Sequence, residues 1–223
     1  MRQRIFDILF TSLALLVLSP LMIPLVIILR LSGEGEIFYK QNRVGRSGVS
    51  FGLLKFATML KNSPNLGTGN MTVKNDPRIL PLGNFLRKTK INELPQLLNI
   101  FLGDMSIIGP RPLTQDHFDG YIPSVQQAIA SVQPGLSGIG SIVFRAEEEM
   151  LHQHDDAKQF YKEYISPYKG SLEVWYVKNN GLLTYFILIF LTVWVVIFSK
   201  SKAVWNIFPS LPKPPVVLEK YLL

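Results

Sequence analysis

A long apolar segment near the N-terminus constrains the fold more than any other feature of the sequence. Residues 5–29 hold one charged side chain, Asp7, in 25 residues, which is enough apolar length to span a bilayer as a helix. A cleaved signal peptide fits poorly, because the apolar run is too long and no small-residue cleavage site follows it. The segment therefore predicts a helix in contact with a membrane.

Prolines and flanking charge favour a helix that enters the bilayer and returns. Ser19-Pro20 and Pro24 lie in mid-segment, where proline removes a backbone hydrogen bond and clashes with the preceding turn. Basic residues flank the segment on both sides, and positive charge marks the cytoplasmic side of a membrane segment. We therefore expect a helix broken at Ser19-Pro20, with both ends on one face. A plain spanning helix is the alternative.

A second apolar segment, residues 181–198, has no charge in 18 residues. As a helix it would be roughly 27 Å long, which is near the lower limit for a span. It too has lysines on both flanks, and Tyr185, Trp194 and Trp205 are side chains that favour the headgroup level. We expect a helix lying in or against the membrane interface. A true span and a buried core helix are the alternatives.

The net charge and the composition limit the kinds of molecule that this chain can bind. The 223 residues include 23 Lys and Arg against 16 Asp and Glu, for a net charge of +7, which fits nucleic acid, anionic lipid or phosphorylated small molecules. The hydrophobic fraction of 48% and the mean hydropathy of +0.22 favour a membrane surface. Nucleic-acid binding has little support, because aromatic residues are not interleaved with the cationic stretches. With no cysteine, disulfides and thiolate metal sites are excluded.

The polar middle of the chain predicts an α/β fold. Two strand-like runs, 37–41 and 50–56, flank a basic turn at 42–48 and predict a β-hairpin. Residues 62–78 are rich in Asn, Gly and Pro and predict a loop. A short helix is expected over 78–90. Its apolar face would carry Ile79, Leu82, Phe85 and Leu86.

The stretch "RKTKINELPQLLNIF", residues 87–101, predicts another helix. Leucines and a phenylalanine recur on one helical face, at positions 94, 97, 98 and 101. Asn92 suits the N-cap, Pro95 the first turn, and Gly103 the end of the helix. Glu93 would then lie at the positive end of the helix dipole. A capped helix is a sufficient structural explanation for this stretch taken alone.

The following motifs add cations at turns. Arg111 lies between Pro110 and Pro112, which suits either an anion clamp or a merely rigid turn. Glycines at 135, 138 and 140 can let the backbone approach a ligand, ahead of a predicted strand that ends at Arg145. Four cations end an apolar run or border a turn: Lys55, Arg87, Arg111 and Arg145. Convergent cations with one or two carboxylates are what a metal–pyrophosphate site needs.

Several motifs occur in a diagnostic order: "RIFDILFTSLALLVLSPLMIPLVIILRL", "IFYKQNRVGRSGVSFGLLKFATM", "LRKTKINELPQLLNIFLGDMSIIGPRPL" and "QPGLSGIGSIVFR". Over roughly residues 1–200 the chain resembles the bacterial sugar transferases, the monotopic phosphoglycosyl transferases, in their minimal form. The resemblance implies an α/β fold with a re-entrant N-terminal helix broken at Ser-Pro, and interfacial helices. It implies one integrated domain: a membrane helix at 1–30, a cytosolic catalytic region at 31–180 and a hydrophobic, membrane-associated helix with a C-terminal tail at 181–223.

The resemblance also implies a reaction. A UDP-sugar gives its phosphosugar to a polyprenol phosphate such as undecaprenyl phosphate, UMP is released and Mg²⁺ is required. This is the first membrane step of surface glycan assembly, at the cytoplasmic face of the bacterial inner membrane. On the matching motifs we expect catalytic roles for Asn92, Glu93, Lys55 and Arg87, phosphate binding by Lys55, Arg87, Arg111 and Arg145, and magnesium ligation by Glu93 and Asp104.

Two departures from the family pattern bear on activity. The family usually has an Asp-Glu dyad whose Asp is the covalent nucleophile, whereas this chain has Asn92-Glu93. An amide has no anionic oxygen to attack phosphorus. The family's "KFRTM" is "KFATM" here, with Ala57 in place of arginine.

Four explanations stay open. Glu93 is the nucleophile, the lipid phosphate attacks directly, the Asn is an engineered change, or the protein is inactive and acts as a membrane scaffold for glycan assembly. We favour an active enzyme, because the other motif residues remain. The sugar is not readable from these motifs, and the oligomeric state is open, with a homodimer as one option.

Overall fold

The structure is a computed structural model that describes residues 2–66, 76–198 and 201–223. The chain forms two compact units. The N-terminal unit comprises Ile5–Asn42 and Gly52–Gly103, and the C-terminal unit comprises Met1–Arg4, Arg43–Phe51 and Asp104–Leu223. Each unit is described by itself. The three-part division expected from the sequence concerns membrane attachment and stays a prediction.

The N-terminal unit is built mainly on one long helix, a hairpin and two short helices. In chain order its elements are α1 (Arg2–Leu31), β1 (Phe38–Val44), β2 (Ser50–Phe56), the 3₁₀ turn η2 (Ser63–Asn65), α2 (Gly83–Lys88), the 3₁₀ turn η3 (Ile91–Glu93) and α3 (Gln96–Leu102). The hairpin tip, with the 3₁₀ turn η1 (Arg46–Gly48), belongs to the C-terminal unit. The predicted hairpin is confirmed.

One end of the apolar helix α1 packs into the core of the N-terminal unit. Leu25 and Leu29 are buried there against Phe56 of β2 and Leu86 of α2. Much of the remaining apolar surface of α1 is exposed, from Ile5 to Leu31. By length and composition α1 is the one helix in the described ranges that is long and apolar enough to cross a membrane. A core helix or a signal sequence can pass the same test, but α1 is mostly unburied.

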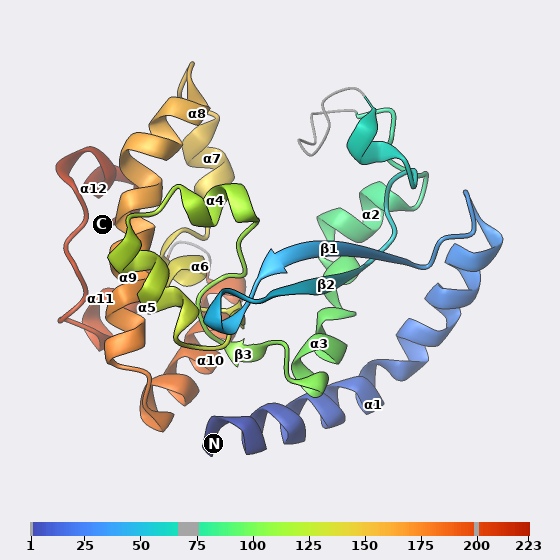
Figure 1. Cartoon of the computed structure of the whole chain (residues 1–223), viewed down its shortest axis with the longest axis horizontal. Helices are drawn as coiled ribbons and strands as arrows, with labels where there is room; N and C mark the ends of the chain where they lie inside the picture. Colours follow the sequence, from blue (N-terminus) through green and yellow to red (C-terminus); the bar gives the residue numbers. More distant parts are fainter. Residues whose placement is uncertain (1, 67–75, 199–200) are drawn as a thin grey trace. The chain divides into compact units, whose positions relative to one another are not determined.

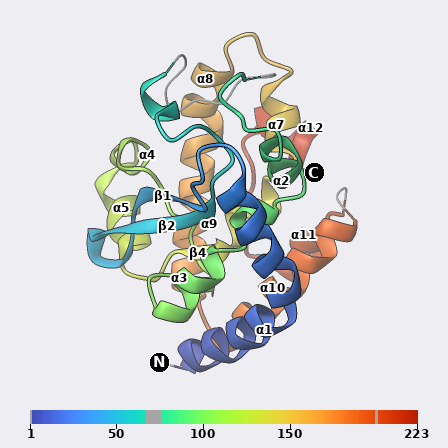
Figure 2. The same ribbon diagram turned by 90° about the vertical axis from the view of Figure 1, so that its right-hand side faces the viewer.

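The helix α1 bends but is not interrupted at its prolines. The predicted break at Ser19-Pro20 is therefore wrong. Both Pro20 and Pro24 lie inside one continuous helix, whose axis bends along its length in Figures 1 and 2. Pro20 has no N–H to offer the Leu16 carbonyl four residues earlier. The Ser19 hydroxyl donates to that carbonyl instead, at 2.7 Å. This bond gives the freed carbonyl a partner and allows the helix to continue.

Asn99 joins α3 to the hairpin. The Leu54 N–H donates to Asn99 Oδ1 and Asn99 Nδ2 donates to the Gly52 carbonyl, each at 2.9 Å. The side-chain amide therefore pairs with the edge of β2 as a neighbouring strand would. Of the loop predicted at 62–78, residues 67–75 lie outside the described residues.

Tertiary contacts shorten the predicted helices. The helix expected over 78–90 is only Gly83–Lys88, so Ile79 lies outside it and pairs instead with Met59 in an antiparallel bridge. Within this helix Phe85, expected on the buried face, is 56% exposed, whereas Leu86 is buried. The next helix begins at Gln96 and ends as predicted at Gly103, whose φ of 103° suits glycine.

The C-terminal unit is mostly helical. It contains β3 (Ser106–Ile108), α4 (Gln115–Asp119), α5 (Pro123–Ala130), β4 (Gly135–Ser137), α6 (Ile139–Val143), α7 (Glu147–Leu151), α8 (Ala157–Phe160), the π-helical turn η4 (Tyr161–Ile165), α9 (Ser166–Lys178), α10 (Leu182–Ile197), α11 (Ala203–Ile207) and α12 (Val216–Leu222). Figure 1 shows α8, η4 and α9 running on as one long helix.

Glycines allow β3 and β4 to pair as parallel strands at very short range. A Cβ at Gly135 would lie 2.1 Å from the Gly109 nitrogen, and one at Gly138 would lie 2.2 Å from the Gly109 carbonyl oxygen. The expectation that these glycines open the backbone to a ligand is therefore wrong, because the chain itself occupies that space. The strand expected before Arg145 is also wrong: after β4 the chain turns at once into the helix α6.

The second apolar segment forms α10, of 16 residues, or about 24 Å at the usual rise per residue. One face is buried on its own unit, through Tyr185, Leu188, Leu191 and Val195. The other face leaves large apolar side chains exposed, among them Leu183, Phe190 and Val193. A fully buried core helix is therefore excluded. Tyr185 is fully buried, so its predicted place at the headgroup level is wrong.

The amide of Asn99 should contribute strongly to the stability of the N-terminal unit. Asn99→Ala leaves the Leu54 N–H and the Gly52 carbonyl without their partner, so we expect a loss of about 1–3 kcal/mol in the free energy of unfolding. Asn99→Asp sets a buried carboxylate oxygen against the Gly52 carbonyl and should cost at least as much. Denaturant unfolding in detergent measures both, with the exposed Asn206→Ala as the control. Equal stability of Asn99→Ala and the control would contradict this role.

Candidate functional site

An ion pair at the end of β2 is the centre of the candidate site. Lys55 Nζ lies 3.8 Å from Glu93 Oε1, and the two side chains are 20% and 24% exposed. Because side chains alternate along a strand, burial of Phe56 in the core directs Lys55 to the opposite face. Glu93 comes from the 3₁₀ turn η3. The pair is partly shielded from water yet still reachable by a ligand.

Asn92 points into the protein, so its predicted role as the cap of α3 is wrong. The residue lies inside η3 and is 7% exposed, and Pro95 takes the cap position. Its Oδ1 is buried with no hydrogen-bond partner in the part of the chain that the structure describes. A buried amide oxygen without a donor costs free energy. Lys90 has a left-handed φ of 61° just before this turn, which separates α2 from η3.

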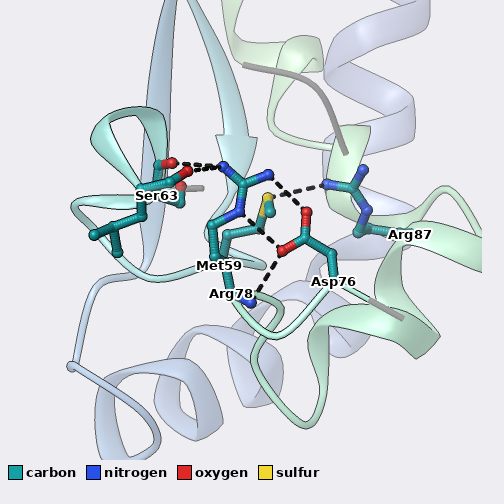
Figure 3. A network of polar contacts seen from close by, with 6 residues as sticks. Met59, Ser63, Asp76, Arg78 and Arg87 are labelled. Carbon is teal, nitrogen blue, oxygen red and sulfur yellow. Dashed lines mark hydrogen bonds and ion pairs between the residues drawn. The ribbon is translucent and has the colours of Figure 1, made fainter. Parts of the chain in front are cut away.

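Arg87, from the last turn of α2, belongs to the same unit as Lys55 and Glu93. Its Nη1 donates to the sulfur of Met59 at 3.7 Å, as Figure 3 shows. Sulfur is a weak acceptor, so this contact orients the guanidinium without neutralising it. Beside it in Figure 3 lies a second, buried arginine, Arg78, paired with Asp76.

The turn that carries Arg111 is rigid, as its two prolines predict. Arg111 is exposed between buried Pro110 and Pro112. Hydrogen bonds hold the backbone on both sides of it: Tyr176 Oη donates to Ile108 O (3.1 Å), Gly109 N to Ser137 O (2.9 Å), Gly135 N to Pro110 O (2.8 Å), Arg43 Nη1 to Pro112 O (3.2 Å) and Val44 N to Leu113 O (2.8 Å). Anion binding by Arg111 stays a prediction.

The other expected site residues also lie in the C-terminal unit. Arg145 is exposed just after α6, and Asp104 is exposed between α3 and β3. The structure thus brings Lys55 and Glu93 together and places Arg87 in the same unit. Within residues 2–66, 76–198 and 201–223, no three His, Asp or Glu side chains gather as a ready-made metal site.

Sequence reasoning missed a buried acid, Glu173 of α9. Its Oε1 receives the Gly140 backbone N–H, while its Oε2 is buried with no hydrogen-bond partner among the described residues. Burial raises the pKa of this carboxyl to about 8, although the positive charge of Lys169 opposes the shift. A Cβ at Gly140 would lie 2.4 Å from Oε1, which explains the glycine there. The available signal was an acid between the apolar residues of a helix.

An aromatic and ionic cluster adjoins this acid. Lys169 pairs with Glu147 and lies over the rings of Phe144, at 5.1 Å, and Tyr161, at 5.6 Å. Tyr161 is presented by the π-helical turn, a feature often found at functional sites. Burial and the charge of Glu147 raise the pKa of Tyr161 to about 12, and the charge of Arg111 opposes this shift. The cluster therefore lies within electrostatic reach of Arg111.

Comparison with known proteins identifies the family. The model of the bacterial sugar transferase family matches residues 1–199. The chain belongs to the bacterial sugar transferase family. It is 32% identical over 213 residues to the exopolysaccharide production protein ExoY of Sinorhizobium fredii, covering 89% of this chain and 87% of that protein.

Two longer relatives carry more specific names. The UDP-glucose:undecaprenyl-phosphate glucose-1-phosphate transferase of Escherichia coli is 33% identical over 187 residues, covering 82% of this chain and 39% of that protein. The undecaprenyl-phosphate galactose phosphotransferase of Salmonella typhimurium is 32% identical over 209 residues, covering 87% and 41%. In this bacterial sugar transferase, the matched residues include every expected site residue.

Glu173 should make the stability of the protein depend on pH. Its folded pKa near 8 exceeds the ordinary value of 4.5, so the folded protein keeps a proton that the unfolded chain releases. The contribution of Glu173 to stability is therefore largest below about pH 4.5 and is lost as pH rises toward 8. Glu173→Gln should flatten this fall, seen as a melting temperature that changes several degrees less between pH 5 and 8. The exposed Glu149→Gln should keep the wild-type slope, and an identical slope in Glu173→Gln would contradict the assignment.

Proposed function

We propose that this chain is a phosphoglycosyl transferase at the cytoplasmic face of the bacterial inner membrane. It moves a sugar phosphate from a UDP-sugar to a polyprenol phosphate such as undecaprenyl phosphate and releases UMP, which starts the assembly of a surface glycan. The Lys55–Glu93 pair carries the proposal, because it sets a cation beside a carboxylate in a chain whose relatives are named for this transfer.

The reaction replaces one phosphoanhydride by another. A new P–O bond forms at the phosphorus that bears the sugar, and its bond to the oxygen bridging to the uridine phosphate breaks. That oxygen leaves with UMP. Negative charge grows on the leaving phosphate, so fixed cations lower the barrier. Lys55 and Arg87 are the cations proposed for this purpose in the N-terminal unit, and phosphate binding by Arg111 and Arg145 of the C-terminal unit stays a prediction.

The residues present fit Mg²⁺. This ion takes one or two protein carboxylates and completes its shell with water and substrate phosphates, so it needs no cluster of acids. Glu93 is a partly exposed carboxylate beside a lysine, which suits that arrangement, and magnesium ligation by Asp104 of the C-terminal unit stays a prediction. When bound, Mg²⁺ would neutralise charge on the diphosphate oxygens. Lys55 then keeps the Glu93 carboxylate oriented at the site.

Asn92 decides which chemistry remains. Its side chain lacks an anionic oxygen, and its Oδ1 is buried. The only carboxylate of the dyad is therefore that of Glu93. Either it attacks the sugar-bearing phosphorus itself, or it holds Mg²⁺ while the lipid phosphate attacks that phosphorus directly. The second candidate function is a non-catalytic membrane scaffold for glycan assembly, and Asn92 is the observation that favours it.

Glu93 should be indispensable for turnover. We expect Glu93→Gln to lower UMP release by at least about a hundredfold, the scale typical of losing a group that stabilises transition-state charge. The assay uses a panel of UDP-sugars with undecaprenyl phosphate and Mg²⁺ in nanodiscs. Glu219→Gln, an exposed change on α12, should retain wild-type rates. Turnover by Glu93→Gln within about twofold of wild type would refute the assignment, and no UMP from wild type with any sugar would favour the scaffold.

Asn92→Asp separates a working variant from an inactivated one. In a working variant the new charge enters a buried position adapted to an amide, so UMP release should fall or change little. In an inactivated protein the restored nucleophile should raise UMP release by several orders of magnitude. We expect the first outcome. Intact-protein mass spectrometry after incubation with UDP-sugar alone then shows whether Glu93 forms a phosphosugar adduct.

The bent helix α1 should enter and leave the membrane on the same face. The chain has no cysteine, so single Gln3→Cys and Ser32→Cys variants mark its two ends. We expect both to resist thiol reagents added from the periplasmic side of intact cells, and both to react after lysis. Replacing Pro20 and Pro24 together with Leu should straighten the helix and favour a span. Labelling of one end alone from outside in the parent chain would contradict the re-entrant arrangement.

A further inference from the structure

We infer that Asp76 and Arg78 are positioning residues for the two proposed phosphate-binding cations of the N-terminal unit, Lys55 and Arg87. They act through residues 57–60, the segment that follows β2. The inference rests on the proposed function, because it concerns how that site is held.

The Asp76–Arg78 pair is buried and fully engaged with its own unit. Arg78 Nε donates to Asp76 Oδ1 at 2.8 Å and Nη2 donates to Oδ2 at 2.6 Å. Arg78 Nη1 also donates to the carbonyls of Ser63 and Leu66, both at 2.7 Å (Figure 3). The side chain of Arg78 is 6% exposed and that of Asp76 is 1% exposed. This guanidinium therefore presents no free face to a ligand, and its role lies in what it holds in place.

The burial of this ion pair calls for a structural explanation other than a gain in stability. The desolvation of two charges can exceed their attraction, so burial alone is weak evidence of a gain in stability. Here the fork of Arg78 ties Ser63 and Leu66 to Asp76, which brings two separate stretches of chain together. The Arg78 N–H also donates to Asp76 Oδ1, at 3.1 Å. The pair thus fixes the backbone of residue 78 as well as its side chain.

The backbone of residues 78–80 pairs with the segment that follows β2, residues 57–60. Leu60 N donates to the Arg78 carbonyl at 2.9 Å and Leu80 N donates to the Thr58 carbonyl at 3.0 Å, on either side of the Met59–Ile79 bridge. This short antiparallel ladder follows directly from β2, which carries Lys55. Position 57 is held as well, because Ala57 N donates to the Ile37 carbonyl at 2.9 Å.

The same segment positions α2 and its arginine. A Cβ at Gly83 would lie 2.2 Å from the Thr58 carbonyl oxygen, so α2 starts in direct backbone contact with the segment. Arg87, near the end of that helix, returns to Met59 through the 3.7 Å contact with its sulfur. Residues 57–60 therefore join both cations to one frame. Cations that neutralise a diphosphate must be held within a fraction of an ångström, which is what a rigid frame provides.

The test replaces the pair in steps and reads binding apart from stability. Asp76→Asn and Arg78→Lys each weaken the fork, and the double variant Asp76→Leu/Arg78→Met replaces both charges by apolar groups so that no lone charge stays buried. Met59→Leu removes the sulfur that Arg87 contacts and keeps the volume. The matched control is Glu36→Gln, which breaks the exposed Lys61–Glu36 ion pair of the same unit.

Three quantities are measured for each variant: the melting temperature, kcat and KM for UMP release, and the Kd for UDP with Mg²⁺ by calorimetry. We expect the double variant to melt below wild type, because the Ser63 and Leu66 carbonyls lose their donor, but to stay folded at the assay temperature and to lose at least about tenfold in kcat/KM and in UDP affinity. Met59→Leu should lose a few-fold in both at an unchanged melting temperature. The control should match wild type throughout.

The readouts keep the two proposals apart. UMP release by wild type tests the proposed function alone, and if it is absent the positioning role is still read from UDP affinity. Wild-type affinity and kcat/KM in the folded double variant would overturn the inference. If the double variant does not fold, Met59→Leu decides, since it leaves the ion pair in place: unchanged UDP affinity and kcat/KM there would overturn the link from the segment to Arg87.

Discussion

The short ladder between residues 58–60 and 78–80 is the constraint on which the N-terminal unit depends. It extends the hairpin by backbone pairing, and Gly83 brings α2 into contact with it at a distance that no side chain would permit. Phe56 then meets Leu86 and the buried end of α1 in one core. The apolar helix α1, the strand that bears Lys55 and the helix that bears Arg87 are thereby built on one frame. The C-terminal unit uses a similar device, because Gly109 and Gly135 allow β3 and β4 to touch next to the Arg111 turn.

Features set by local chemistry were predictable from the sequence. The hairpin, the rigid Pro-Arg-Pro turn and the end of α3 at Gly103 all follow from neighbouring residues. Features set by distant contacts were not. Asn92 has the chemistry of a cap but turns inward, because the chain forms a 3₁₀ turn ahead of Pro95. Residues 141–143 form helix rather than strand, and the glycines of this loop serve backbone packing.

The same distinction between local chemistry and distant contacts holds for the residues of the candidate site. Lys55 and Glu93 could be named from their motifs, and the structure places them in contact. The buried pair of Asp76 with Arg78, the buried Glu173 and the pairing of Lys169 with Glu147 gave little sign in the sequence, because ion pairing and burial depend on distances that spacing does not fix. The apolar segments were recognisable by composition. Only the structure shows that α1 bends without a gap, aided by Ser19, and that α10 has one protein-facing side.

The central claim is that the Lys55 end of β2 binds the diphosphate of a nucleotide sugar. The most direct test is calorimetric titration of the detergent-solubilised protein with UDP and Mg²⁺, comparing wild type with Lys55→Met and with the exposed control Lys213→Met. The account predicts a Kd at least about tenfold higher for Lys55→Met, or about 1.4 kcal/mol of binding free energy, and no change for the control. Equal affinity of Lys55→Met and wild type would contradict it.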